Sequence, residues 1–152
     1  NEEHQATQAL EAAARRRREL RDALVALEDT VASSVHDSDR WRRLVAARIA
    51  ELGVAFAEHV AETEAPGGLY DEMEEIAPNV QGKARRLREE HPRLTGAIAD
   101  AEARFAAPFP EGTDLDALRD DLQRLMGRLV RHRQHGADLV WEAYELDIGG
   151  AG

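Results

Sequence analysis

Hydrophobic residues recur every three or four positions along most of this chain, a spacing typical of helices that bury one face. The connections between these stretches are short, so neighbouring helices are expected to run antiparallel. Asp37 or Ser38, and Thr113 or Asp114, are expected to cap helix starts. The segment "LYDEMEEIA" (69–77) predicts one further short helix, which the following proline ends. We therefore predict an all-α, up-down-up-down four-helix bundle with long helices over about 3–33, 40–64, 79–106 and 114–147.

The third and fourth long helices have the most regular apolar stripes. Their expected core positions are 80, 84, 87, 91, 94, 98, 101 and 105 in one helix, and 115, 118, 122, 125, 129, 132, 136, 139, 143 and 146 in the other. These positions are apolar or small except at His91 and His132, and position 136 is Gly. The periodicity therefore predicts that both histidines face the core.

The chain also resembles itself, which predicts a bundle of two repeated helical hairpins. The stretch "RRELRDALVALE", which begins at Arg17, is similar to "HPRLTGAIADAE", which begins at His91. In the second helix of each hairpin, His59 aligns with His132. At about 1.5 Å per residue these four side chains lie about 20–27 Å from the same end of the bundle, so we expect them to form one layer.

Histidine is costly to bury unless it is paired, and imidazole is a common ligand of iron, zinc, copper and nickel. Glu62 and His135 lie one turn beyond two of the histidines, and residues three apart can reach the same ion. Protonation of free histidines predicts metal release below about pH 6.5. The predicted metal ligands are His59, His91, His132, Glu62 and His135, with Arg17 modulating the site.

Composition narrows the classes of function. The net charge of −10 argues against general nucleic-acid binding, and no apolar run approaches the roughly 20 residues that span a membrane. The chain has no cysteine, which excludes disulfides and thiolate ligands. No signal peptide is visible, so an intracellular, cytoplasmic protein is expected.

Three segments together resemble the hemerythrin-like (HHE cation-binding) domains. They are "EHVAETEAPGGLYDE" at 58–72, "LREEHPRL" at 87–94 and "LVRHRQHGADLVWEAY" at 129–144. The resemblance covers roughly residues 15–148 and implies a four-helix bundle that commonly holds a di-iron centre. It implies a single domain over 1–152, with 1–14 as an N-terminal helix extension and 148–152 as a flexible tail.

The chain departs from the family pattern at several ligand positions. Arg17 stands where the family has a histidine, Thr63 and Gly136 stand where it has carboxylates, and Thr95 replaces a second histidine of the third helix. A complete di-iron set is therefore not expected, nor is a reversible oxygen carrier. The resemblance implies a small module that binds or senses a metal ion through His59, His91 and His132, with iron first and zinc or manganese as alternatives.

Two other interpretations remain open. Arg17 could pair with Glu62 or Glu64 and form a metal-free polar network with the histidines, which would fix the register of the helices. The bundle would then act as an interaction or assembly module, with a protein partner or as a homo-oligomer. The second of these interpretations is an enzyme that uses a bound iron for peroxide or similar chemistry. A non-catalytic role is favoured over it, and no catalytic residue is assigned.

Overall fold

The computed structural model describes residues 2–146 and contains no strand within them. The expectation of an all-α chain with four long helices and one short helix is confirmed. The expected flexible tail, 148–152, lies outside the described residues. The helices are α1 (Glu2–Ala32), α2 (Ser38–Glu64), α3 (Leu69–Ile76), α4 (Gln81–Phe105) and α5 (Leu115–Trp141), with a 3-10 turn η1 (Pro78–Val80) and a π-helical turn η2 (Glu142–Leu146).

The long helices begin where short acidic side chains can cap them. The carboxylate of Asp37 accepts hydrogen bonds from the backbone N–H groups of Asp39 and Arg40, and Asp114 accepts one from that of Ala117. Pro92 lies inside α4, and the helix runs through it without a break.

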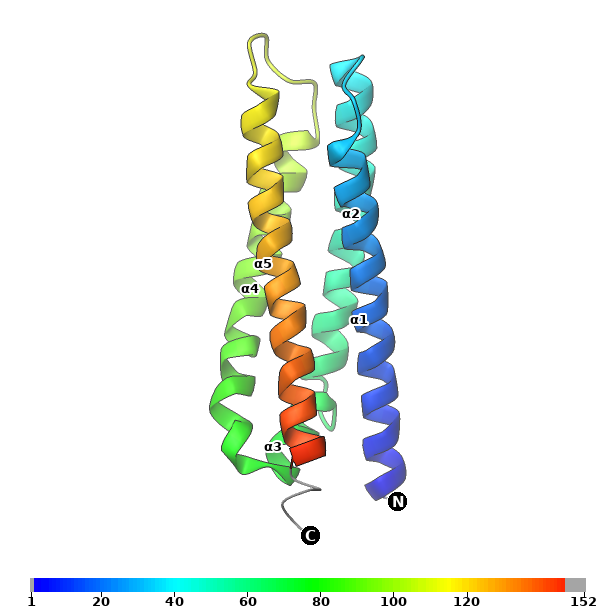
Figure 1. The fold of residues 1–152 in the computed structure, drawn as a ribbon, viewed down its shortest axis with the longest axis vertical. Coiled ribbons are helices and arrows are strands. Elements are labelled where there is room, and N and C mark those ends of the chain that lie inside the picture. The colour runs from blue at the N-terminus through cyan, green and yellow to red at the C-terminus, as the bar shows by residue number, and fades with distance from the viewer. Residues whose placement is uncertain (1, 147–152) are drawn as a thin grey trace.

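The four long helices lie side by side along the long axis of the molecule (Figure 1). Their principal contacts join α1 to α2, α2 to α4, α4 to α5 and α5 to α1. The short helix α3 lies at the end of the molecule that also holds the N-terminus, where it contacts α1, α2 and α4. No helix in the described range is long and apolar enough to cross a membrane.

The hydrophobic core is divided into two clusters, as the apolar stripes with their polar interruptions predict. The lower core, around α3, contains Ala13, Leu69, Tyr70, Met73, Ala77, Val80, Ala84, Leu87, Leu139 and Ala143. The upper core contains Leu20, Leu24, Leu27, Val31, Trp41, Val45, Ile49, Leu52, Ala55, Phe56, Leu94, Ile98, Ala101, Phe105, Leu122, Leu125, Met126 and Leu129. On α4 the boundary falls between Leu87 and Leu94, so His91 separates the two cores.

Candidate metal centre

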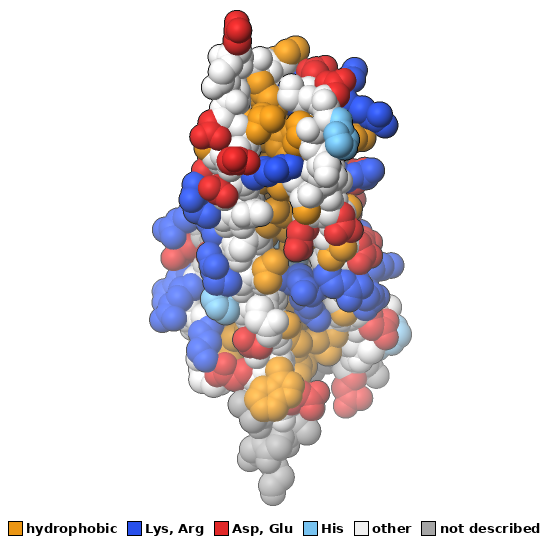
Figure 2. All heavy atoms as spheres, turned by 45° about the horizontal axis from the view of Figure 1, so that its top comes forward, with side chains coloured by type: hydrophobic (Ala, Val, Ile, Leu, Met, Phe, Trp, Pro, Cys, Tyr) orange, Lys and Arg blue, Asp and Glu red, His pale blue; other side chains and the backbone are white. Residues whose placement is uncertain are grey.

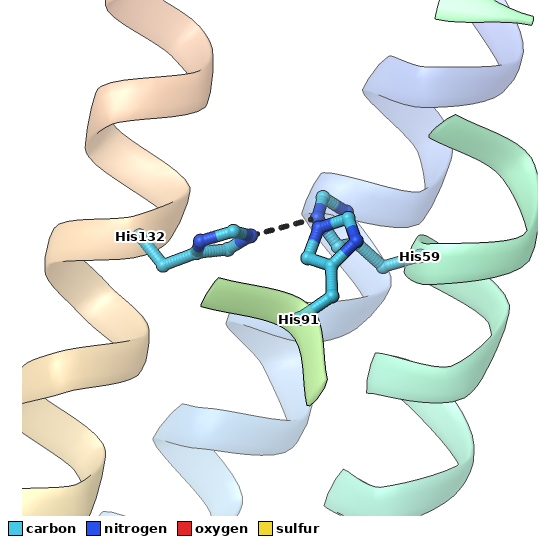
Figure 3. Close-up of side chains that lie close together, drawn as sticks. All are labelled: His59, His91 and His132. Carbon is cyan, nitrogen blue, oxygen red and sulfur yellow. Dashed lines mark hydrogen bonds between the residues drawn. The ribbon is translucent and has the colours of Figure 1, made fainter. Parts of the chain in front are cut away.

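Three histidines from three helices meet at this boundary. His59 of α2, His91 of α4 and His132 of α5 are 4%, 1% and 2% exposed. One ring nitrogen of each lies within 4.8 Å of those of the other two, and Figure 3 shows the three rings turned toward one another. Among the described residues, no Asp or Glu belongs to this group. The group therefore offers nitrogen donors alone.

The spacing of the rings suits ligands of a single ion. Nε2 of His59 lies 3.2 Å from Nε2 of His132. Two imidazoles bound at 2.0–2.1 Å to a tetrahedral ion have their nitrogens about 3.3 Å apart. The ring of His91 is centred 5.3 Å from that of His59 and 4.9 Å from that of His132. Small side-chain movements would thus bring all three nitrogens around one ion.

Two glutamates lie next to the outer nitrogens of His91 and His132. Oε1 of Glu90 lies 3.2 Å from Nδ1 of His132 and accepts its hydrogen bond. Oε2 of Glu64 lies 3.1 Å from Nδ1 of His91, although it is not aligned with the ring N–H. Carboxylates in this position keep the proton on Nδ1 and leave the lone pair of Nε2 for a metal. Sequence reasoning did not identify Glu90, and considered Glu64 only as a partner of Arg17.

The contact with Glu90 also determines which nitrogen donates in the hydrogen bond between His59 and His132. Because His132 donates through Nδ1, its Nε2 is the acceptor and Nε2–H of His59 is the donor. Nδ1 of His59 then carries a lone pair, and this buried atom has no hydrogen-bond partner. His59 must move its proton to Nδ1 before its Nε2 can bind a metal.

Aromatic side chains enclose the three imidazoles. The ring of Phe56 is centred 5.7 Å from that of His59 and 5.8 Å from those of His91 and His132. On the α3 side, the hydroxyl of Tyr70 lies 3.2 Å from Nε2 of His91, and the two rings are stacked. Tyr70 is 2% exposed.

Burial keeps the histidines neutral. Loss of hydration, with smaller contributions from the nearby His132, His91 and Arg17, lowers the pKa of His59 to about 3. Loss of hydration also lowers the pKa of His91 and of His132, while Glu64 and Glu90 respectively oppose the change. The neutral form is the one that binds metals. The predicted release of metal below about pH 6.5 is therefore corrected, because protons compete for these nitrogens only at lower pH.

The other two predicted ligands do not join the group. Glu62 is half-buried and lines a surface pocket between α1 and the loop after α2. His135 is exposed and lines pockets between α4 and α5. At 3.6 residues per turn, a residue three positions on is rotated by about 60° from the histidine, and one four positions on by about 40° the other way. The inward positions are therefore those of Thr63, which is buried, and Gly136.

Arg17 lies at the level of the three histidines, as the repeat predicts. It stands on α1 between Ala13 of the lower core and Leu20 of the upper core, and it is half-buried. Its charge contributes to the lowered pKa of His59. Loss of hydration lowers the pKa of Arg17 itself, and the charges of Arg133 and Arg18 add to this effect.

The metal-free interpretation has Arg17 paired with Glu62 or Glu64, and this pairing is not observed. Within the described residues, no ion pair or hydrogen bond joins Arg17 to Glu62 or Glu64. Glu64 faces His91 instead, and the neighbouring Arg16 is the arginine that binds carboxylates, those of Glu19 and Glu58. Arg16 reaches α2 through its ion pair with Glu58, whereas the charge of Arg17 lies close enough to that of Arg133 on α5 for the two to affect each other.

No protein-family model matches this chain, and neither a curated protein nor a solved structure is similar enough to it to assign a family. The candidate site is therefore described by its own geometry: three buried, neutral imidazoles, two of them backed by carboxylates, that converge between two apolar cores.

Proposed function

We propose that the chain is a hemerythrin-like, up-down-up-down bundle that binds or senses one transition-metal ion through His59, His91 and His132. The observation that supports this proposal is the convergence of one nitrogen from each buried histidine within 4.8 Å. Glu64 and Glu90 act as outer partners that orient His91 and His132. The proposed role is intracellular and non-catalytic.

The donor set argues for a mononuclear centre. A di-iron site needs carboxylates that bridge or complete two ions, and none of the described carboxylates belongs to the histidine group. Imidazole suits iron and zinc, whereas manganese prefers oxygen ligands. Iron, which the family resemblance implies, and zinc are therefore the leading candidates. Three protein ligands would leave at least one coordination position for another group.

Elemental analysis of protein purified without chelators tests this proposal. We expect about one ion per chain, or its uptake on reconstitution with Fe²⁺ or Zn²⁺. Each of the substitutions His59→Gln, His91→Gln and His132→Gln should lower the amount bound. The matched control is His135→Gln, which removes an exposed histidine from α5 and should leave the amount unchanged. A wild-type protein that takes up neither ion would contradict the proposal.

One observation favours the alternative, a metal-free assembly module. The hydrogen bonds from His59 to His132 and from His132 to Glu90 partly satisfy the layer without an ion. The exposed apolar side chains, of which Trp141 is the largest and 57% exposed, would then serve a partner or a second copy. Figure 2 shows hydrophobic side chains exposed among charged ones on one face. Sedimentation that gives a monomer at all concentrations tested would argue against self-assembly.

A further inference from the structure

Tyr70 reaches the histidine layer from an element that the three histidines do not use. It lies on α3, the short helix that follows the glycine-containing loop after α2. Its hydroxyl is buried and lies 3.2 Å from Nε2 of His91. The phenol thus places an oxygen donor beside the nitrogen donors.

The distances around these groups match a four-coordinate site. Nε2 of His59 and Nε2 of His132 are 3.2 Å apart, and so are Nε2 of His91 and the hydroxyl oxygen of Tyr70. A tetrahedral ion with bonds of 2.0–2.1 Å has edges of about 3.3 Å between its ligands. These two pairs share no atom, and each has the separation of one edge of such a tetrahedron. One ring nitrogen of each histidine lies within 4.8 Å of those of the other two, so the remaining edges would close by side-chain movement when an ion binds.

We propose that Tyr70 is the fourth ligand of the metal centre, that it binds as the phenolate, and that it makes the site selective for Fe³⁺ over Zn²⁺. This inference rests on the proposed function. When the metal–oxygen bond forms, the phenol O–H bond breaks and the proton passes to solvent. No electron is transferred, because the iron is supplied as Fe³⁺. The ion then has one anionic oxygen ligand and three neutral nitrogen ligands, and hard oxygen anions favour the higher charge.

Burial and the charges of Glu64 and Glu90 raise the pKa of Tyr70 above its ordinary value, so the bound ion has to supply most of the charge that stabilises the phenolate. The nearby Arg88 acts in the same direction as the ion. The guanidinium of Arg88 lies over the ring of Tyr70, 5.2 Å from its centroid, and Arg88 is held there by an ion pair with Asp71. A cation over the ring face stabilises electron density in the ring. In the metal-free chain the hydroxyl of Tyr70 donates to the lone pair of Nε2 of His91, so the phenol oxygen already lies next to a nitrogen that would bind the ion.

The test compares Fe³⁺ binding by the wild-type chain and by Tyr70→Phe, with Fe³⁺ delivered from nitrilotriacetate. The wild type should show a visible phenolate-to-iron charge-transfer band. Tyr70→Phe should lose the band and bind Fe³⁺ more weakly, by more than the roughly 10–100-fold typical of losing an outer partner. Its affinity for Zn²⁺ should change less. The chain contains two tyrosines, so Tyr144→Phe is the matched control and should keep the band.

The outcomes separate the inference from the proposed function. If the wild type binds neither Zn²⁺ nor Fe³⁺, the proposed function fails. If Fe³⁺ binds through the histidines but gives no charge-transfer band, or gives one that survives in Tyr70→Phe, the inference is overturned. Should Tyr70→Phe not fold, the Tyr144→Phe protein made with ring-deuterated tyrosine provides a second measurement, because Tyr70 is then the one labelled residue. Resonance Raman bands that are excited within the charge-transfer absorption must then shift when the tyrosine ring is deuterated.

Discussion

At the scale of single residues, the site depends on what the outer nitrogens of the histidines contact. Glu90 accepts from Nδ1 of His132 and Glu64 approaches Nδ1 of His91, whereas Nδ1 of His59 has no partner. The three imidazoles are therefore not equivalent. His91 and His132 have their inner lone pairs set for a metal, and His59 must change its tautomer at a cost.

Replacing Glu90 by Gln should weaken metal binding by roughly 10–100-fold, because an amide holds the Nδ1 proton of His132 less strongly than a carboxylate does. Titration with Zn²⁺ against a competing chelator measures the change. The adjacent Glu89→Gln is the matched control, since Glu89 is exposed. Equal affinities for the two variants would show that Glu90 does not support the site.

The lowered pKa of His59 predicts how the metal-free protein responds to acid. Its pKa is about 3 in the folded chain and about 6.5 when unfolded, so between these values the unfolded chain binds a proton that the folded chain does not. The free energy of unfolding contributed by His59 is complete above about pH 6.5 and falls by up to about 1.4 kcal/mol per pH unit as the pH decreases.

Urea unfolding of metal-free protein across this pH range measures the slope. The exposed His36, changed to Gln, serves as the control and should leave the slope unaltered. The variant His59→Leu should flatten it. If the wild type and His59→Leu lose stability in parallel between about pH 6.5 and pH 3, then His59 is not buried in the neutral form.

Sequence alone could identify the three histidines but not most of their partners. His91 and His132 interrupt regular apolar stripes, and the repeat relates His59 to His132, so periodicity is enough to place all three inside. The contacts of Glu90 with His132 and of Tyr70 with His91 join different helices. They depend on the relative rotation and axial offset of those helices, which a stripe along one helix does not specify.

At the scale of elements, α3 and the loop before it determine one side of the site. The loop "APGG" ends α2, and the backbone N–H of Gly68 donates to the carbonyl of Ala65. Gly67 has φ +72°, a conformation that favours glycine. This tight turn directs the chain back toward the core, so that Leu69 and Tyr70, the first two residues of α3, are buried. The sequence predicted the break and the short helix, but the inward direction of Tyr70 follows from the turn.

Two glycine substitutions should have opposite effects on stability. A Cβ on Gly96, in the exposed middle of α4, meets no atom within 4 Å, so Gly96→Ala should raise the free energy of unfolding by about 0.5–1 kcal/mol. A Cβ on Gly68 would lie 2.7 Å from the carbonyl oxygen of Glu62 and 2.8 Å from that of Ala65, so Gly68→Ala should lower it. Thermal unfolding of both variants provides the comparison, and the same sign for both would contradict it.

At the scale of the whole molecule, the histidine layer separates two cores of different composition. The upper core contains large side chains such as Trp41, Phe56 and Phe105, whereas the lower core includes Ala13, Ala77, Ala84 and Ala143. Smaller side chains bury less apolar surface per residue, so the lower half gains less from packing. The periodic stripes of α4 and α5 run through both clusters, but the burial of Leu69 and Met73 of α3 in the lower one required the fold.

Native-state hydrogen exchange should therefore show two levels of protection. Backbone amides of α3 and of the first turns of α4 should exchange through partial openings that cost less free energy than opening of the upper half of α2. Binding of a metal ion should raise the protection of the lower half more than that of the upper half, because the ion would link α2, α4 and α5 at the boundary. Uniform protection in the metal-free protein would show that the two cores unfold together.

The near-complete burial of the three histidines also has a kinetic consequence. The three side chains are 1–4% exposed and Phe56 and Tyr70 pack against them, so an ion has little access to the nitrogens in the folded chain beyond the surface pocket between α4 and α5 that reaches His132. Uptake and loss must then follow transient separation of the helices, and the residence time of the ion is set by how often the bundle opens. Mild acid would leave such an ion in place, while a chelator would remove it no faster than the protein allows, whatever the chelator concentration.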